Sequence, residues 1–514
     1  MATNTTPAAP PPATPIRAPA RESRWRRLRA RARRAPRPLV LLLLVAALQS
    51  VAWDVALPAF QGPDEDTHFA YVQHLAETGE VPSATTGGTA YSSEEEEALV
   101  TLNLLPLIGD ASSRPAWSEA DLKAWHAVER TINSAGRGNG AGPNPIAKNP
   151  PLYYAAMSIP YRLFLWLPLL KRLFVMRLFN ALCYLATIAM TWLLAGELFG
   201  SVRWKQLLAA ASVALEPQLS FMSAVINADN LLIALCTAVL LASVRLVTRG
   251  PSMSRVLTTS ALTAAAVLTH GRGLVTLPVL GVGLLVAWLK FRPSTADALR
   301  RAAAAVATVG VAFLAYVAFG RGGGSLYGGQ ITELNSKTSF NLRQFASSIY
   351  EFYFPRLLSM QPRLGPAYGY KQVFIDTFYG SFGWLEVKFT ERIYDVLQLL
   401  SALGLIGLYT AVVARWRRLW AAWPVVAVML TLLATNLLFL HYVSYRALLS
   451  DNGADPLIVG RYLLPMVSLF GLAIAFTLGS LPKRLGPPMA ALVLALGVLL
   501  SLGGIGITVV RFYA

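Results

Sequence analysis

The sequence predicts an all-α protein, a polytopic bundle of about 11 membrane-spanning helices with interfacial helices in its first long outer loop. Three observations predict this fold class. Hydrophobic residues make up 55% of the 514-residue chain and charged residues 14%, whereas soluble domains carry about 25% charged residues. Apolar runs of about 20 residues, long enough to cross a bilayer as a helix, recur along the chain. The net charge of +18 comes from basic residues in short segments between these runs, which indicates cytoplasmic loops and not a nucleic-acid-binding surface.

The chain begins with a segment, residues 1–38, that we expect to be a disordered, basic cytoplasmic tail. Its first half is rich in Pro, Ala and Thr, and its second half is dense in arginine, which favours contact with anionic lipid. A signal peptide would also place basic residues before an apolar run, but no convincing small-residue cleavage site is present after it. The N-terminus is therefore predicted inside, and the first helix reaches the outer side at Pro58.

The stretch from residue 150 to 170 decides the topology of all the later helices. It is apolar but interrupted by proline, and if it crossed the membrane, the basic loop from Arg245 to Arg255 would face outside. We therefore predict that it lies along the surface as an interfacial helix, within an outer loop of residues 58–172. The same loop contains the acidic run Glu94–Glu97, which we interpret as the solvated face of a helix.

On this topology the protein is expected to be a multi-pass protein of the plasma membrane. A catalytic transmembrane module covers residues 39–319 and includes the first outer loop, a second outer loop covers 320–392, and C-terminal transmembrane helices cover 393–514 and end outside. The predicted spans are residues 39–57, 173–199, 206–225, 230–247, 256–270, 273–290, 301–319, 393–414, 419–441, 460–480 and 488–510.

The segment directly after the first span, Gly62–Phe69, carries the most informative residues. It places Asp64, Glu65, Asp66 and His68 within a few residues of the membrane surface, where a carboxylate is costly unless it is paired, hydrated or used. A helix start explains the acids equally well, with Asp64 as the N-cap and the next two in the first turn. Both interpretations stay open at this point.

Further polar and aromatic residues fall on the same predicted outer face. Most have a simpler interpretation: Asp229 as a helix cap, Arg272 and Arg461 as contacts to lipid headgroups, and Lys148 as a solvated side chain. Tyr153, Tyr154 and Trp384 could be anchors at the membrane interface. The full set is Lys148, Tyr153, Tyr154, Asp229, His270, Arg272, Trp384, Arg461 and Tyr462.

Taken together, these residues fit one kind of reaction. A carboxylate can take a proton from a hydroxyl, and arginine and lysine can stabilise the charge that develops on a departing phosphate. An apolar surface beside them can hold a lipid tail. The combination fits group transfer from a lipid-linked phosphate to an acceptor hydroxyl, and no nucleotide-binding fingerprint or zinc spacing is present.

These motifs resemble those of the GT-C superfamily of integral membrane glycosyltransferases, and more narrowly a bacterial domain-of-unknown-function family within it. The fold expected from the resemblance is a transmembrane helical bundle of GT-C type. The matching residues are Pro63, Asp64, Glu65, His68 and Phe69; Pro150 to Tyr154; Asn227 and Asp229; Gly383 to Leu385; and Gly460 to Leu463 with Pro465.

The resemblance implies transfer of a sugar from a polyprenyl-phosphate donor to an envelope glycan, lipid or protein acceptor on the extracytoplasmic face. Attack opposite the departing phosphate would invert the anomeric carbon. Asp64 or Glu65 would be the base and Asp229 a second acid. The remaining residues are assigned to the donor phosphate (Arg272, Arg461 and Lys148) and to substrate contacts (His68, Tyr153, Tyr154, His270, Trp384 and Tyr462).

Two questions stay open on the sequence. Some GT-C enzymes hold a divalent metal at the paired acids and others do not, so Mg²⁺ or Mn²⁺ at Asp64, Glu65 and Asp229 is left open. Related enzymes often carry lysine where this chain has His270-Gly271-Arg272, which would pass the phosphate contact to Arg272. The alternative functions are a transporter or lipid flippase, which usually shows internal repeats that this chain lacks, and a non-catalytic envelope scaffold.

Overall fold

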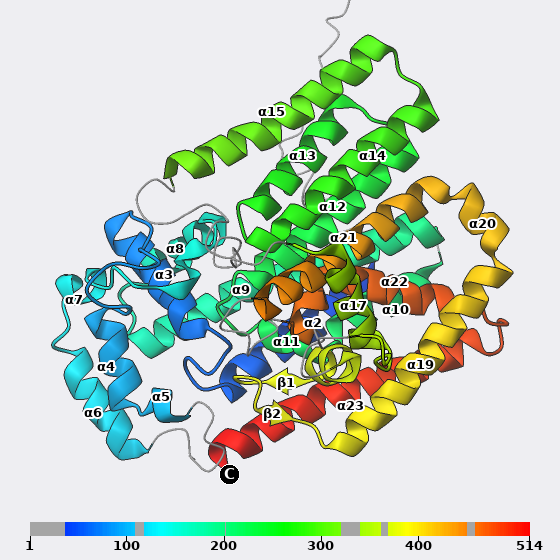
Figure 1. Ribbon diagram of the computed structural model, residues 1–514. Helices are drawn as coiled ribbons and strands as arrows, with labels where there is room; N and C mark the ends of the chain where they lie inside the picture. The colour runs from blue at the N-terminus through cyan, green and yellow to red at the C-terminus, as the bar shows by residue number, and fades with distance from the viewer. Residues whose placement is uncertain (1–35, 108–117, 201, 320–339, 361–368, 450–457) are drawn as a thin grey trace, which may run out of the picture.

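The computed structural model describes residues 36–107, 118–200, 202–319, 340–360, 369–449 and 458–514. Almost all of the predicted disordered tail lies outside these residues. The described chain is helical nearly throughout (Figure 1), and its strands are one short antiparallel pair, β1 (Ser381–Phe382) and β2 (Val387–Lys388). The prediction of an all-α fold is confirmed.

Within the described residues, nine helices are long and apolar enough to cross a membrane, and each overlaps a predicted span. Two of them begin as a 3₁₀ turn before the α-helix, namely η2 (Gly271–Val275) with α14 (Thr276–Phe291) and η5 (Gly460–Met466) with α22 (Val467–Leu478). The other seven are α2 (Arg37–Ala56), α9 (Leu169–Phe199), α12 (Asp229–Arg249), α15 (Thr295–Phe319), α19 (Glu391–Ala414), α21 (Trp423–Leu448) and α23 (Gly486–Tyr513).

The two other predicted spans are shorter helices in the structure. Residues 206–225 form α10 (Arg203–Ala214) and α11 (Pro217–Met222), because Pro217 disfavours helical geometry at Glu216 before it. Glu216 instead caps α11 by accepting hydrogen bonds from the backbone of Gln218 and Leu219. Residues 256–270 form α13 (Met253–Val267), which has 15 residues. The total of about 11 spans therefore stays a prediction.

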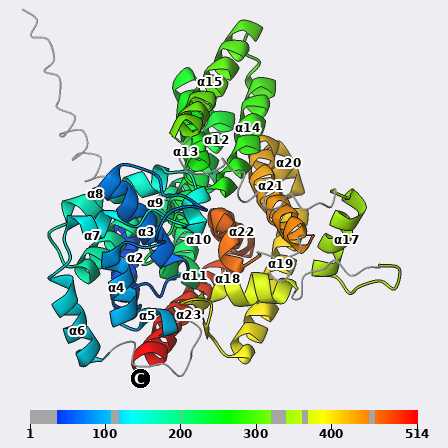
Figure 2. The same cartoon turned by 60° about the vertical axis from the view of Figure 1, so that its left-hand side comes forward.

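Between α2 and α9 the chain forms a module of short helices. Figures 1 and 2 both show it gathered beside α9, on one side of the bundle. Its last helix has 12 residues, too few to cross a bilayer of about 30 Å, as the charge pattern predicted. The helices are α3 (Glu65–Thr78), α4 (Ser93–Thr101), α5 (Leu104–Leu107), α6 (Glu119–Glu129), α7 (Ser134–Gly138), η1 (Pro145–Lys148) and α8 (Leu152–Leu163).

The acidic run in α4 is only partly solvated. Glu94 and Glu95 are buried, whereas Glu96 and Glu97 are exposed. Glu94 accepts hydrogen bonds from Arg172 of α9 and from Gln73 of α3. The interpretation of the whole run as a solvated face is therefore wrong, because α4 turns Glu94 toward a buried arginine at the start of an apolar helix.

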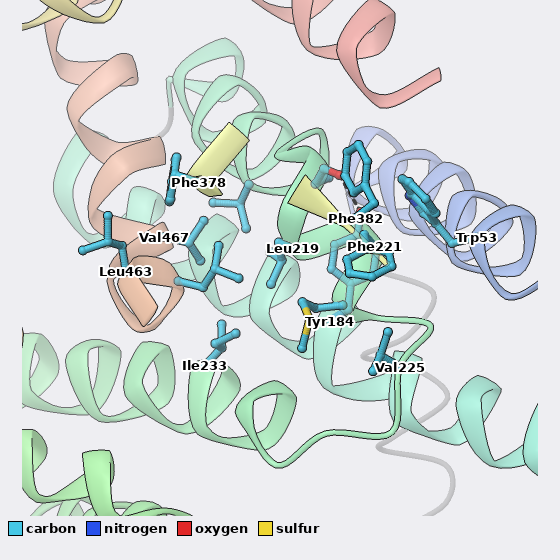
Figure 3. Packing of buried hydrophobic residues seen from close by; sticks show 14 of the residues in the cluster. Trp53, Tyr184, Leu219, Phe221, Val225, Ile233, Phe378, Phe382, Leu463 and Val467 are labelled. Atoms are coloured by element: carbon cyan, nitrogen blue, oxygen red, sulfur yellow. Dashed lines mark hydrogen bonds between the residues drawn. The ribbon is translucent and has the colours of Figure 1, made fainter. Parts of the chain in front are cut away.

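A buried hydrophobic cluster fixes the end of α2 against the rest of the bundle (Figure 3). The Trp53 ring lies 5.3 Å from the Phe221 ring of α11 and 4.8 Å from the Phe382 ring of β1, measured between centroids. Its indole nitrogen donates to the Ser220 hydroxyl at 3.0 Å. This packing orients the turn after α2, and with it the motif at residues 62–69.

The remaining described elements lie around the C-terminal spans. They are α17 (Leu342–Tyr353), the π-helix η4 (Lys371–Asp376), α18 (Thr377–Tyr379) and α20 (Trp416–Ala421).

Candidate active site

The turn after α2 is locked onto the turn between α11 and α12. A Cβ added to Gly62 would lie 2.4 Å from a methyl carbon of Val225, so only glycine allows this approach. The Asn227 side chain donates to the Pro63 carbonyl at 3.2 Å. These two contacts bring together the segments that carry Asp64 and Asp229, which the sequence separates by more than 160 residues.

Asp64 occupies the N-cap position of α3 but does not use its side chain as a cap. Its backbone is left-handed, with φ of 57°, which is uncommon for a residue with a Cβ. Its carboxylate accepts a hydrogen bond of 2.8 Å from Arg461 of η5. The side chain is 37% exposed, so Asp64 combines a charged partner with access from outside the protein.

Glu65 lies next to Asp64 in sequence but faces the opposite way. It is fully buried and accepts hydrogen bonds from the Arg177 guanidinium of α9 and from the Ile226 backbone N–H. The same arginine also donates to the carbonyls of Leu57 and Pro58. Glu65 and Arg177 therefore tie the turn to α9. Sequence reasoning missed Arg177, although a basic residue inside an apolar run is a signal in itself.

Asp229 forms a second pair of acid and arginine. It is the first residue of α12, and Ala228 takes the N-cap position, so the capping interpretation does not describe it. Its carboxylate accepts a hydrogen bond from Arg272 of η2, and its backbone N–H donates to the Asn227 side chain. The His270 Nε2 atom lies 4.0 Å from the Asp229 carboxylate.

Tyr462 joins the two pairs. The Arg272 guanidinium carbon lies 4.3 Å from the centre of the Tyr462 ring, and that of Arg461 lies 5.3 Å from it. Both arginines are mostly buried, at 8% and 9% exposure. In the part of the chain that the structure describes, Arg272 Nη1 and Arg461 Nε and Nη1 have no hydrogen-bond acceptor. Buried guanidinium donors of this kind are suited to hydrogen-bond an anion.

His68 adds a neutral group beside these charges. Its Nδ1 atom lies 2.9 Å from the Tyr154 hydroxyl, and Asn149 donates to the same hydroxyl at 3.1 Å. Burial lowers the pKa of His68 to about 4, with opposing effects from the nearby Asp64 and Asp229 carboxylates. His68 is therefore neutral at pH 7. Lys148, the residue before Asn149, is at the end of η1.

His270 holds the turn that carries Arg272. Its Nδ1 atom accepts a hydrogen bond of 3.0 Å from the backbone N–H of Arg272, which caps the first turn of η2. This contact orients the arginine toward Asp229.

Two of the predicted substrate-contact residues bond to the scaffold. The Tyr153 hydroxyl donates to Asn180 of α9 at 3.0 Å. The Trp384 indole donates to the Phe60 carbonyl at 3.4 Å, which joins the β1–β2 turn to the turn after α2. Direct substrate contact by either residue stays a prediction.

The three acids offered for a divalent metal are not gathered at one point. Among the described residues, no group of three or more His, Cys, Asp or Glu side chains has the arrangement of a metal site. Glu65 is turned toward Arg177, while Asp64 and Asp229 face the arginines on Tyr462. The three residues as arranged do not fit a shared metal ion, because each carboxylate already meets a guanidinium.

Comparisons with known proteins give one family match over most of the chain. A family described as predicted membrane protein (DUF2142) matches residues 47–470. Among curated proteins no match is found.

Several solved structures are distantly similar. Apo ArnT from Cupriavidus metallidurans has a TM-score of 0.46 and 17% identity, covering 87% of this chain and 60% of that chain. ArnT bound to undecaprenyl phosphate has a TM-score of 0.42 and 14% identity, covering 92% and 75%. The oligosaccharyltransferase AglB from Archaeoglobus fulgidus, in complex with an inhibitory peptide and a dolichol-phosphate, has a TM-score of 0.44 and 14% identity, covering 93% and 56%. This chain thus spans less than two thirds of the length of apo ArnT and of AglB, and likeness at this level carries no inference about activity.

Proposed function

The chain belongs to the DUF2142 family of predicted membrane proteins, and we propose that it is a membrane glycosyltransferase. It takes a sugar from a polyprenyl-phosphate donor and passes it to a hydroxyl group of an envelope glycan, lipid or protein on the extracytoplasmic face of the plasma membrane. The observation that carries the proposal is the pair of buried arginines on Tyr462, each bonded to one acid and each with unsatisfied donors.

The donor phosphate binds between Arg272 and Arg461. Their free N–H groups supply the hydrogen bonds, and the two positive charges stabilise the phosphate as it leaves the sugar. Tyr462 holds both guanidinium groups over its ring, which limits the reorganisation needed when the anion arrives. Asp229 keeps Arg272 in place through their hydrogen bond.

Asp64 is the general base. It is the acid in this group with the most exposed side chain, so an acceptor hydroxyl can reach it. The hydroxyl proton passes to the carboxylate as the hydroxyl oxygen attacks the anomeric carbon, and the bond from that carbon to the phosphate oxygen breaks. Attack opposite the leaving phosphate inverts the anomeric centre. Glu65 is less suited, because both of its oxygens are held by Arg177.

Donor binding tests the arginine assignment. A synthetic prenyl-phosphate sugar is titrated into the purified protein, and Arg272→Gln and Arg461→Gln are each expected to weaken binding by about tenfold or more, the scale of a lost charged hydrogen bond. Lysine at either position should restore binding only in part, because it offers one ammonium group in place of a planar fork of donors.

The control for this titration is Arg343→Gln. Arg343 is an exposed arginine of α17, and its loss should leave donor affinity unchanged. Wild-type affinity in both the Arg272 and the Arg461 glutamine variants would show that the phosphate binds elsewhere.

A further inference from the structure

The far end of the bundle from Tyr462 carries a pocket with a strong positive charge. The pocket is lined by Ala414, Arg415, Trp416, Arg417, Arg418 and Ser480, from the end of α19, the start of α20 and the turn between α22 and α23. Figure 1 shows α20 at the right of the molecule and the α3 to α8 module at the left. η5 and α22 connect the two ends over 19 residues, or about 28 Å of helix, close to the thickness of a bilayer core.

The pocket is a built feature of the fold. Arg415 donates to the Ser480 carbonyl at 3.3 Å, which ties the end of α19 to the turn after α22. Lys205 of α10 donates to the neighbouring Gly479 carbonyl at 3.0 Å. A Cβ at Gly479 would lie 2.5 Å from the end of the Lys205 side chain and 2.6 Å from the Ala475 carbonyl oxygen, so the lysine packs closely against this turn. Three helix ends are therefore held together around the basic residues.

The three arginines that line the pocket are not paired with acids. Among the described residues, none of Arg415, Arg417 and Arg418 forms an ion pair with a carboxylate. Lys483 and Arg484 add two exposed positive charges in the adjoining turn. Cations that gather without acids at the end of membrane helices attract the negative surface of a membrane leaflet.

Exposed tryptophans lie at the basic pocket and in the residues that follow it. Trp416 is 57% exposed and Trp420 is 72% exposed, and Trp423 is also exposed. Tryptophan is enriched at the level of lipid headgroups, because its ring is apolar and its N–H is polar. The combination of exposed tryptophans and unpaired arginines matches a phospholipid, whose acyl chains meet the rings and whose phosphate meets the cations.

We propose that this pocket binds the phosphate-bearing headgroup of an anionic phospholipid, in the leaflet opposite the candidate active site. The site is separate from the arginines on Tyr462 and does not depend on the proposed transfer reaction. The bound lipid bridges Arg417 and Arg418 to the turn between α22 and α23, so it holds α19 and α22 at a fixed spacing.

Lipid binding by a double variant tests this site. The protein is placed in nanodiscs of phosphatidylcholine with and without phosphatidylglycerol, and the retained phosphatidylglycerol is measured by native mass spectrometry. Arg417→Gln with Arg418→Gln should lower retention about tenfold, because each basic group near an anionic surface contributes several-fold in affinity. The control is Arg292→Gln with Arg300→Gln, which removes two exposed arginines outside the pocket and should leave retention unchanged.

The other outcomes each decide the matter. Equal loss in the pocket variant and the control would mean a diffuse attraction of the basic face, and would overturn the proposal. Displacement of the lipid by inorganic phosphate alone would mean a free-anion site instead. A second measurement covers a variant that fails to fold: in the wild-type protein, phosphatidylglycerol should slow amide exchange in α20, and exchange unaffected by that lipid would also overturn the proposal.

Discussion

At the scale of single side chains, the neighbours Glu65 and Asp64 have different roles: Glu65 stabilises the fold, whereas Asp64 is the proposed base. Glu65 is fully buried against Arg177, and its removal leaves the buried arginine with Asp54, 3.4 Å away, as its remaining acidic partner. Glu65→Gln is therefore expected to lower the free energy of unfolding by about 3 kcal/mol. Thermal unfolding in detergent measures this loss. An unchanged melting temperature for Glu65→Gln would show that Glu65 does not stabilise the fold.

His68 gives a pH dependence of stability with a definite sign. Burial lowers its folded-state pKa to about 4, below its ordinary value of 6.5. Between these two values the unfolded chain binds a proton at this histidine more readily than the folded protein does. The contribution of neutral His68 to the free energy of unfolding is therefore complete above pH 6.5 and is lost as the pH falls toward 4. His68→Gln should make the melting temperature of the protein less dependent on pH between these two values. Parallel profiles for the two proteins would show that His68 does not titrate as proposed.

The candidate site was largely predictable from sequence, but its pairings were not. Asp64, Asp229, Arg272, Arg461 and Tyr462 fall together in the structure, as their shared position at helix ends suggested. Which acid would meet which arginine depends on contacts between separate segments, 43 residues apart for Asp229 and Arg272 and 397 apart for Asp64 and Arg461. The partner of Glu65 was missed for the same reason, since Arg177 lies 112 residues away.

In the loops that join the helices, Gly62 sets the position of the motif. A Cβ there would overlap the Val225 side chain, so Gly62→Ala should displace the Pro63–Asp64 segment and reduce turnover. Val225→Ala in the same protein should restore part of the activity by making room. The control is Gly88→Ala, because a Cβ at Gly88 meets nothing within 4 Å. Full activity in Gly62→Ala would show that the motif tolerates movement.

The helices themselves were predicted well where one apolar run makes one helix. Among the described residues, nine predicted spans coincide with long apolar helices, whereas the run at residues 206–225 breaks because Glu216 and Pro217 begin a new helix. Burial of Glu94 was not predictable, because it depends on Arg172 approaching from another helix.

For the protein as a whole, the proposed active site and the proposed lipid site lie on opposite sides of the membrane, at the two ends of the bundle. Arg203 begins α10, and Lys205, two residues later, donates to the Gly479 carbonyl beside the basic pocket, so Arg203 marks this end of the bundle. Gly88 is exposed in the module that carries α3 and marks the other end. In a background of Cys183→Ala and Cys236→Ala, Gly88→Cys should react with an impermeant thiol reagent in intact cells, and Arg203→Cys should react only after permeabilisation. Labelling of Arg203→Cys in intact cells would reverse the topology and place Asp229 inside.

The most direct measurement is sugar transfer by the Asp64→Asn protein. Donor binding and transfer from a synthetic prenyl-phosphate sugar are measured separately on purified wild-type protein, Asp64→Asn, Glu65→Gln and Asp395→Asn. Asp395 is an exposed acid of α19 paired with Lys371, so it serves as the matched control. Asp64→Asn should keep donor affinity and lose about 10²-fold or more in turnover, the scale of a lost general base, while Asp395→Asn stays at the wild-type rate. Wild-type turnover by both Asp64→Asn and Glu65→Gln would show that the base lies outside the turn after α2.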